Sequence, residues 1–244
     1  MISFIHIGKT GGTTINKLLD GKVKRYRQYH LEKNYNAKEQ YIIWLRNPIT
    51  RFVSAFNHSY YGVHTDPKSI SKFNMQQCLF PQRMISTQNS LYRFSKKYDT
   101  LIKQFNNANE LAESLSSPDL ERRKKARELM NSQEEHLFKG IGWYLNNGNF
   151  IAKNNDRVIF VGKLETMKDD IEALGKQLNV KVDSELKLRE NIYVDESMKQ
   201  LSPLAIQNII EWYTPTDYAA LTQLHAHGWI SQEILDSYYK YSNE

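Results

Sequence analysis

The sequence of 244 residues contains a single cysteine, Cys78, which excludes an internal disulfide and is typical of a reducing compartment. It has no apolar run near the ~20 residues that a membrane-spanning helix needs. Its first residues, Met1 to Ile7, hold no basic leader before a long apolar stretch, so we expect no secretory signal. These absences predict a soluble, cytoplasmic protein without a membrane partner.

The composition is that of an ordinary globular protein, with 40% hydrophobic and 25% charged residues. The length suits a single domain, residues 1–244, with a substantial core. The formal net charge of +6 favours anionic partners such as a nucleotide or a sulfated glycan. The densest basic run, residues 121–128, is flanked by acids in a helical pattern. It indicates a solvated helix face, with an anion-contacting patch as the alternative.

Three short β-rich runs organise the chain: residues 2–7, 41–45 and 158–161. Each is followed by a loop and a helical pattern, which is typical of β-loop-α units on a parallel sheet. Residues 23–29, rich in Lys and Arg, are a weaker candidate for a further strand. Residues 65–155 carry a helical pattern and predict a helical insertion or lid. The fold class is therefore α/β, a parallel β-sheet flanked by helices.

Helix-start signals support this assignment. Asn47 can cap a helix whose first position is Pro48, and an apolar stripe runs from Ile49 to Tyr60. A second amphipathic helix is expected over residues 164–178. Near the C-terminus, Ser202 and Thr214 each precede a proline, and each predicts a helix cap. Asp217 would complete a capping box with Thr214.

Between the first strand and its helix lies a loop rich in glycine and threonine. Its residues are Gly8, Lys9, Thr10, Gly11, Gly12, Thr13 and Thr14. Glycines let backbone N–H groups approach an anion, and the N-terminus of the following helix adds unpaired donors. The hydroxyls and the mobile charge of Lys9 complete a P-loop-like phosphate site. The alternative is that these glycines and threonines only form a turn and cap the helix, without binding a ligand.

This loop differs from the phosphate loop of nucleotide kinases and other nucleotide phosphotransferases. That loop reads G-x-x-x-x-G-K-[ST], with its lysine directly after the second glycine. Here Lys9 precedes Gly11 and Gly12, and no lysine stands before Thr13. The order of residues therefore argues against a P-loop nucleotide phosphotransferase.

A second motif follows the strand at residues 41–45. It reads R-x-P-x-x-R-x-x-S, and its residues are Arg46, Pro48, Arg51 and Ser54. Arg46 stands where the strand ends, beside the first loop of a parallel sheet, so its guanidinium can clamp a phosphate. Ser54 lies on the helix face of Arg51 and His58, opposite the apolar stripe, and can donate to the same phosphate. For Arg51, a phosphate contact and a structural ion pair both stay open.

The two motifs resemble those of sulfotransferases that use 3′-phosphoadenosine 5′-phosphosulfate (PAPS). K-T-G-G-T-T is similar to the family's 5′-phosphosulfate loop, and the Arg46 motif is similar to its 3′-phosphate motif. The resemblance is closest to the carbohydrate branch that contains the heparan sulfate 6-O-sulfotransferases. Residues 158–165 resemble a later strand of the family. Residues 81–85 match a stretch of the glycan branch in part, which makes Arg83 a candidate substrate contact.

The resemblance implies an enzyme that moves a sulfuryl group from PAPS to an acceptor hydroxyl on a carbohydrate. It implies cofactor contacts from Lys9, Thr10, Gly11, Gly12, Thr13, Thr14, Arg46 and Ser54. We expect no metal, because no group of His, Cys, Asp and Glu has metal-ligand spacing in the sequence. We expect no nucleic acid partner, since only the net charge favours one. Trp143 and Tyr144 could stack on a sugar or on adenine, although core packing is the alternative.

The transfer needs a base for the acceptor hydroxyl and a stabiliser for the leaving group. We expect Lys9 to stabilise the negative charge that develops on the leaving phosphate oxygen. Related glycan sulfotransferases carry a catalytic histidine between the two motifs, and His30 is the histidine of this interval. His58, which shares a helix face with Ser54, is the second candidate and could also contact the acceptor. We read His6 as structural, and His136 as lying in a late helical segment unconnected with the motifs.

The competing hypotheses are a P-loop-like nucleotide phosphotransferase and a non-catalytic nucleotide-binding module.

Overall fold

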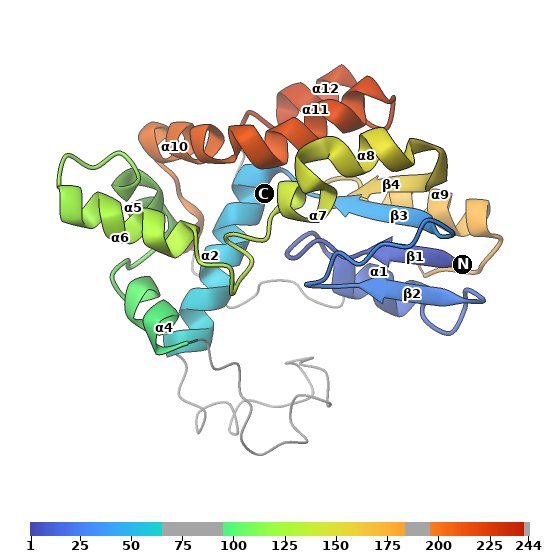
Figure 1. Cartoon of the computed structure of the whole chain (residues 1–244), viewed down its shortest axis with the longest axis horizontal. Coiled ribbons are helices and arrows are strands. Elements are labelled where there is room, and N and C mark those ends of the chain that lie inside the picture. The colour runs from blue at the N-terminus through green and yellow to red at the C-terminus, as the bar shows by residue number, and fades with distance from the viewer. Residues whose placement is uncertain (65–94, 184–195, 242–244) are drawn as a thin grey trace, which may run out of the picture.

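The computed structural model describes residues 1–64, 95–183 and 196–241 (Figure 1). Cys78 and Arg83 lie outside the described residues, so Arg83 stays a prediction.

A four-stranded parallel sheet forms the centre of the fold. Its strands are β1 (Ile2–Ile5), β2 (Tyr26–Tyr29), β3 (Gln40–Leu45) and β4 (Val158–Lys163), in the order β2-β1-β3-β4. The three expected strands are confirmed, and residues 23–29 supply the fourth, β2, at an edge of the sheet. Because all strands are parallel, their C-terminal ends meet at one edge, which points toward the long helix α2 (Pro48–His64) (Figure 1).

Alternate residues of the central strands enter two separate cores, as the period of a strand requires. Phe4, Ile42 and Trp44 pack with residues of α1 (Gly12–Leu19) and α9 (Met167–Leu178) on one face. Ile43 and Leu45 join the larger core, which contains α2 and the remaining helices. The observed α/β class, a parallel sheet flanked by helices, is the predicted one.

The helices on the larger core come from two parts of the chain. The first group is α4 (Lys96–Ile102), α5 (Ala108–Ser114), α6 (Leu120–Met130), α7 (Ile141–Leu145) and α8 (Asn149–Asn154). The second group is α10 (Pro203–Tyr213), α11 (Ala219–Ala226) and α12 (Gln232–Ser237). Between residues 95 and 155 the structure contains helices and no strand, in agreement with the helical pattern. The basic run lies on α6, whose buried residues are Ala126, Leu129 and Met130, so its charges lie mainly on the solvated side.

Two of the three expected caps are confirmed, and one is wrong. The Asn47 side chain accepts a hydrogen bond from the Ile49 amide at 2.8 Å, and Ser202 caps α10 by accepting from Ala205. Thr214 does not start a helix: residues Thr214–Tyr218 form a π-helical turn that joins α10 to α11. Asp217 is buried there because it balances the charge of Arg51 in the core.

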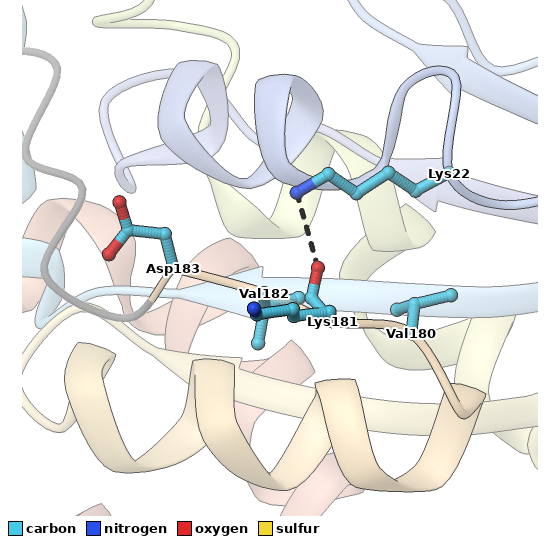
Figure 2. Close-up of a pocket in the computed structure, with 5 residues that line it drawn as sticks. All are labelled: Lys22, Val180, Lys181, Val182 and Asp183. Carbon is cyan, nitrogen blue, oxygen red and sulfur yellow. Dashed lines mark hydrogen bonds between the residues drawn. The ribbon is translucent and has the colours of Figure 1, made fainter.

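Among the described helices, none has the length and apolarity to cross a bilayer. Figure 2 shows a surface hollow between the segments that follow α1 and α9, where the Lys22 ammonium donates to the Lys181 carbonyl at 3.2 Å. The segment after α1 leads into the N-terminal end of β2. Ligands of parallel sheets bind at the opposite, C-terminal edge, so we place the candidate site there.

Candidate functional site

The loop between β1 and α1 is sharply folded. Lys9 and Gly11 both have left-handed backbone, with φ of 70° and 82°, and Gly11 occupies the N-cap of α1. Glycine adopts this backbone conformation without strain, whereas a lysine adopts it at a cost, so contacts with neighbouring residues must stabilise the Lys9 backbone. Thr10 is fully buried, and its hydroxyl donates to the Ile7 carbonyl at 2.9 Å. The Thr10 side chain therefore stabilises the loop from within.

Two further glycines are required by close packing. A Cβ atom on Gly8 would lie 2.2 Å from Nδ1 of His136, and one on Gly12 would lie 2.0 Å from Cδ2 of His6. Any larger residue would displace an imidazole ring. The loop therefore lies directly against two histidines.

The N-terminus of α1 faces the loop without a side-chain cap. The first N–H groups of a helix have no intrahelical acceptor, and they lie at the positive end of the helix dipole. Thr13 in this first turn is half-buried, whereas Thr14 is buried. Loop and helix start thus form a local geometry that suits an anion.

Arg46 connects the second motif to this loop. Its Nε donates to the Thr50 hydroxyl at 2.9 Å, and its Nη1 donates to the Lys9 carbonyl at 3.3 Å. The structure therefore brings Arg46 beside the glycine-rich loop, as expected from adjacent strand ends. Ser54 lies on α2 and is buried, with 6% of its surface exposed.

Arg51 has a different environment. It is completely buried, its Nε lies 3.4 Å from Oδ2 of Asp217, and its Nη1 donates to the His136 carbonyl at 2.8 Å. Burial acts to lower the pKa of Arg51, but the Asp217 carboxylate together with Tyr213 and Tyr144 outweighs burial, and the pKa is raised. Of the two possibilities, the structural ion pair describes Arg51.

Four histidines from four separate segments form a row beside the loop, which we call the histidine row: His6, His30, His136 and His58. His30 stacks on His6 with ring centroids 4.2 Å apart. His136 lies between His30 and His58, at centroid distances of 5.7 and 5.6 Å. The fold therefore brings both sequence-based candidates for the base, His30 and His58, to the same site.

His30 has the properties of a proton acceptor. Its Nδ1 lies 3.1 Å from the His6 carbonyl, which can only accept, so Nδ1 carries the proton and Nε2 holds the lone pair. Burial lowers the pKa of His30, the His6 carbonyl opposes this, and the charges of Lys139 and Lys9 lower the pKa further. The imidazole is therefore neutral near pH 7.

Three residues of this site were not predicted from the sequence. His136 was read as unconnected with the motifs, but it packs against Gly8 of the loop, and that interpretation was wrong. His6 lies just after β1 and stacks on His30, which gives it a place in the site as well as a packing role. Glu135 was not predicted to be a site residue, yet burial raises the pKa of its carboxyl to about 7. Neither Glu135 nor His136 carries a local motif, because only tertiary packing brings this segment to the loop.

A cationic and aromatic surface lies near His30. The ammonium groups of Lys33 and Lys139 lie 4.5 and 5.5 Å from the ring centroid of Trp143. Lys139 is close enough to affect the pKa of His30. Tyr144 is buried, and its hydroxyl accepts from the Leu31 amide at 3.2 Å, so it belongs to the core rather than to a stacking surface.

The arrangement combines an anion site with a neutral imidazole. The glycine-rich loop, Lys9 and Arg46 can hold a doubly anionic group, and His30 can take a proton from a nucleophile beside it. Such a combination suits transfer of an anionic group to a hydroxyl.

Comparison with protein-family models matches residues 1–218 to the family described as "Sulfotransferase family". The match spans both motifs, β4 and the segment of Glu135 and His136. No curated protein and no solved structure matches the chain.

Proposed function

The chain belongs to the sulfotransferase family, and on that basis we propose that it moves a sulfuryl group from PAPS to a hydroxyl of a carbohydrate. The observation that carries the proposal is the contact between the two motifs, in which Arg46 donates to the backbone of Lys9. A donor with phosphate groups at both its 3′ and 5′ positions needs two anion sites from adjacent strand ends. These residues supply them.

The donor is held by the two motifs. The glycine-rich loop and the start of α1 bind the 5′-phosphosulfate through backbone N–H groups and the Thr13 and Thr14 hydroxyls. Arg46 binds the 3′-phosphate, with Ser54 as a second donor. Protein groups alone neutralise both phosphates, so binding of the desulfated product, 3′-phosphoadenosine 5′-phosphate (PAP), needs no metal.

In the transfer step, the acceptor oxygen forms a bond to sulfur while the bond from sulfur to the 5′-phosphate oxygen breaks. The acceptor hydroxyl proton passes to Nε2 of His30. The negative charge that develops on the phosphate oxygen is stabilised by Lys9. PAP and a sulfate ester leave the enzyme, and His30 releases its proton to solvent.

Two features support a carbohydrate acceptor. The motifs resemble the carbohydrate branch most closely. In addition, the half-buried Trp143 can pack on a sugar ring, while Lys33 and Lys139 beside it attract carboxylate or sulfate groups. His58 and Arg83 are the proposed further acceptor contacts. Because the sequence contains a single cysteine, we place the enzyme in the cytoplasm. We propose no nucleic acid partner.

The proposal is tested by an acceptor screen with PAPS that carries labelled sulfur. We expect label to enter one or more glycans, and expect none to enter when PAPS is replaced by labelled inorganic sulfate. Label that enters only small phenols would overturn the carbohydrate assignment. Absence of transfer to any hydroxyl compound would overturn the proposed activity.

Replacement of Arg46 by alanine should weaken PAP binding by ~1.5–3 kcal/mol, because it deletes a charge-assisted contact. Preference for PAP over adenosine 5′-phosphate should shrink by a similar amount. Calorimetry with both ligands measures the effect, and Arg123→Ala on α6 is the control for loss of one positive charge. If Arg46→Ala kept the full preference, Arg46 would not read the 3′-phosphate.

A further inference from the structure

Three side chains with metal-binding atoms meet at the far end of the histidine row. His58 comes from α2, and Glu135 and His136 come from the segment between α6 and α7. One ligand atom of each side chain lies within 4.8 Å of those of the other two. Such a group is invisible in the sequence, because His58 is far from the Glu135–His136 pair along the chain.

Two atoms of this group have no hydrogen-bond partner among the described residues. They are Oε2 of Glu135 and Nδ1 of His136, and both residues are only 5% exposed. A buried polar atom without a partner costs about 1–3 kcal/mol, and native proteins contain few of them. A ligand that accepts lone pairs from both atoms would remove this cost.

We propose that His58, Glu135 and His136 bind one divalent transition-metal ion of the Zn²⁺ class. Two imidazoles and one carboxylate are the donor set that suits Zn²⁺, and three protein ligands leave a fourth position open. At Zn²⁺ bond lengths of about 2.0–2.1 Å, tetrahedral ligand atoms lie roughly 3.4 Å apart. The ligand atoms, which lie within 4.8 Å of one another, must move closer to reach that separation, and His58 is half-buried rather than fully packed. This site goes beyond sulfuryl transfer and does not rest on it.

The charges around the site act against a cation. Lys9 and Arg51 are near enough to act on the His136 imidazole. Arg51 is balanced by Asp217, but the Lys9 ammonium adds to the positive potential. The site must therefore bind its ion through strong ligand bonds, and removal of the Lys9 charge should tighten metal binding.

Titration of the chelator-treated protein with Co²⁺ tests the proposal, because tetrahedral Co²⁺ shows characteristic visible absorption. We expect one equivalent to bind, and Zn²⁺ to displace it. Removal of a ligand should weaken binding about 100-fold or more, since loss of an outer partner alone costs about 10–100-fold. His58→Ala and Glu135→Gln should show this loss, whereas Lys9→Ala should bind more tightly.

His227→Ala is the control, because His227 is exposed and outside the site. It should bind Co²⁺ as the unmodified protein does. Glu135→Gln keeps the shape of the side chain, and circular dichroism of each variant shows that it is folded. Absence of tetrahedral Co²⁺ absorption, or equal affinity in folded Glu135→Gln and in the unmodified protein, would overturn the site. PAP titration of the metal-free protein is a separate measurement, so failure here leaves the proposed function unaffected.

Discussion

Replacement of His30 by alanine should lower turnover by about 10²–10⁴-fold, the usual contribution of a general base. PAP affinity should stay close to that of the unmodified enzyme, because in the proposed transfer His30 contacts the acceptor hydroxyl and no phosphate. Its Nδ1 is held by the His6 carbonyl, so Nε2 is the atom that accepts the proton. Turnover at saturating PAPS, together with PAP calorimetry, measures both quantities.

The pH profile gives a second measure of His30. Burial and the charges of Lys139 and Lys9 lower its pKa, so the imidazole becomes protonated only below its usual range near pH 6.5. Because the protonated form cannot act as a base, the rate should fall as pH decreases through that lowered pKa. This acidic limb should disappear in His30→Ala.

His58→Ala is the matched control, because His58 lies in the same histidine row, next to His136 and at the opposite end from His6. It should lower turnover less than His30→Ala and keep the acidic limb. If the two variants exchanged these results, the base would be His58 and the proposed transfer would still stand. If neither lowered turnover, the row would not supply the base.

Replacement of Lys9 by alanine should lower turnover at saturating PAPS by about 10²–10³-fold, similar to the loss of one donor to a developing oxyanion. PAP affinity should fall much less, since the charge on the leaving oxygen is largest in the transition state. The left-handed backbone at this position does not favour either residue, because both lysine and alanine carry a Cβ atom. Steady-state kinetics over a range of PAPS concentrations separates the two effects.

Lys17→Ala is the control for Lys9, because Lys17 lies exposed on the last turn of α1 and carries the same charge. It should leave turnover unchanged. A Lys9→Ala variant that lost affinity but kept its turnover at saturation would make Lys9 a ligand of the ground state only.

Much of the sheet could be predicted from local pattern. Apolar strands such as β3 are buried on both faces, and each is followed by a turn and an amphipathic helix, so composition and periodicity suffice. The position of Arg46 followed from the same logic, because ends of adjacent parallel strands meet at one edge. Asn47 was recognisable as a cap because capping is a local hydrogen bond.

The remaining features depend on contacts between distant segments. Thr214 and Asp217 have the local pattern of a capping box. In the structure Asp217 instead forms a buried ion pair with Arg51, and this tertiary interaction replaces the local cap. His136 enters the site only because the segment after α6 packs on Gly8. The structure shows that a side chain at Gly8 would clash with the His136 ring. The sequence shows only a glycine in a loop that contains other glycines.

The central claim is tested most directly by titration of the protein with PAP and with ATP in buffer that contains a metal chelator. In the proposed function the two motifs bind a 3′-phosphate and a 5′-anion through protein groups alone, so PAP should bind tightly under these conditions and ATP much more weakly. ATP binding as tight as that of PAP, or PAP binding that depends absolutely on added Mg²⁺, would contradict the account.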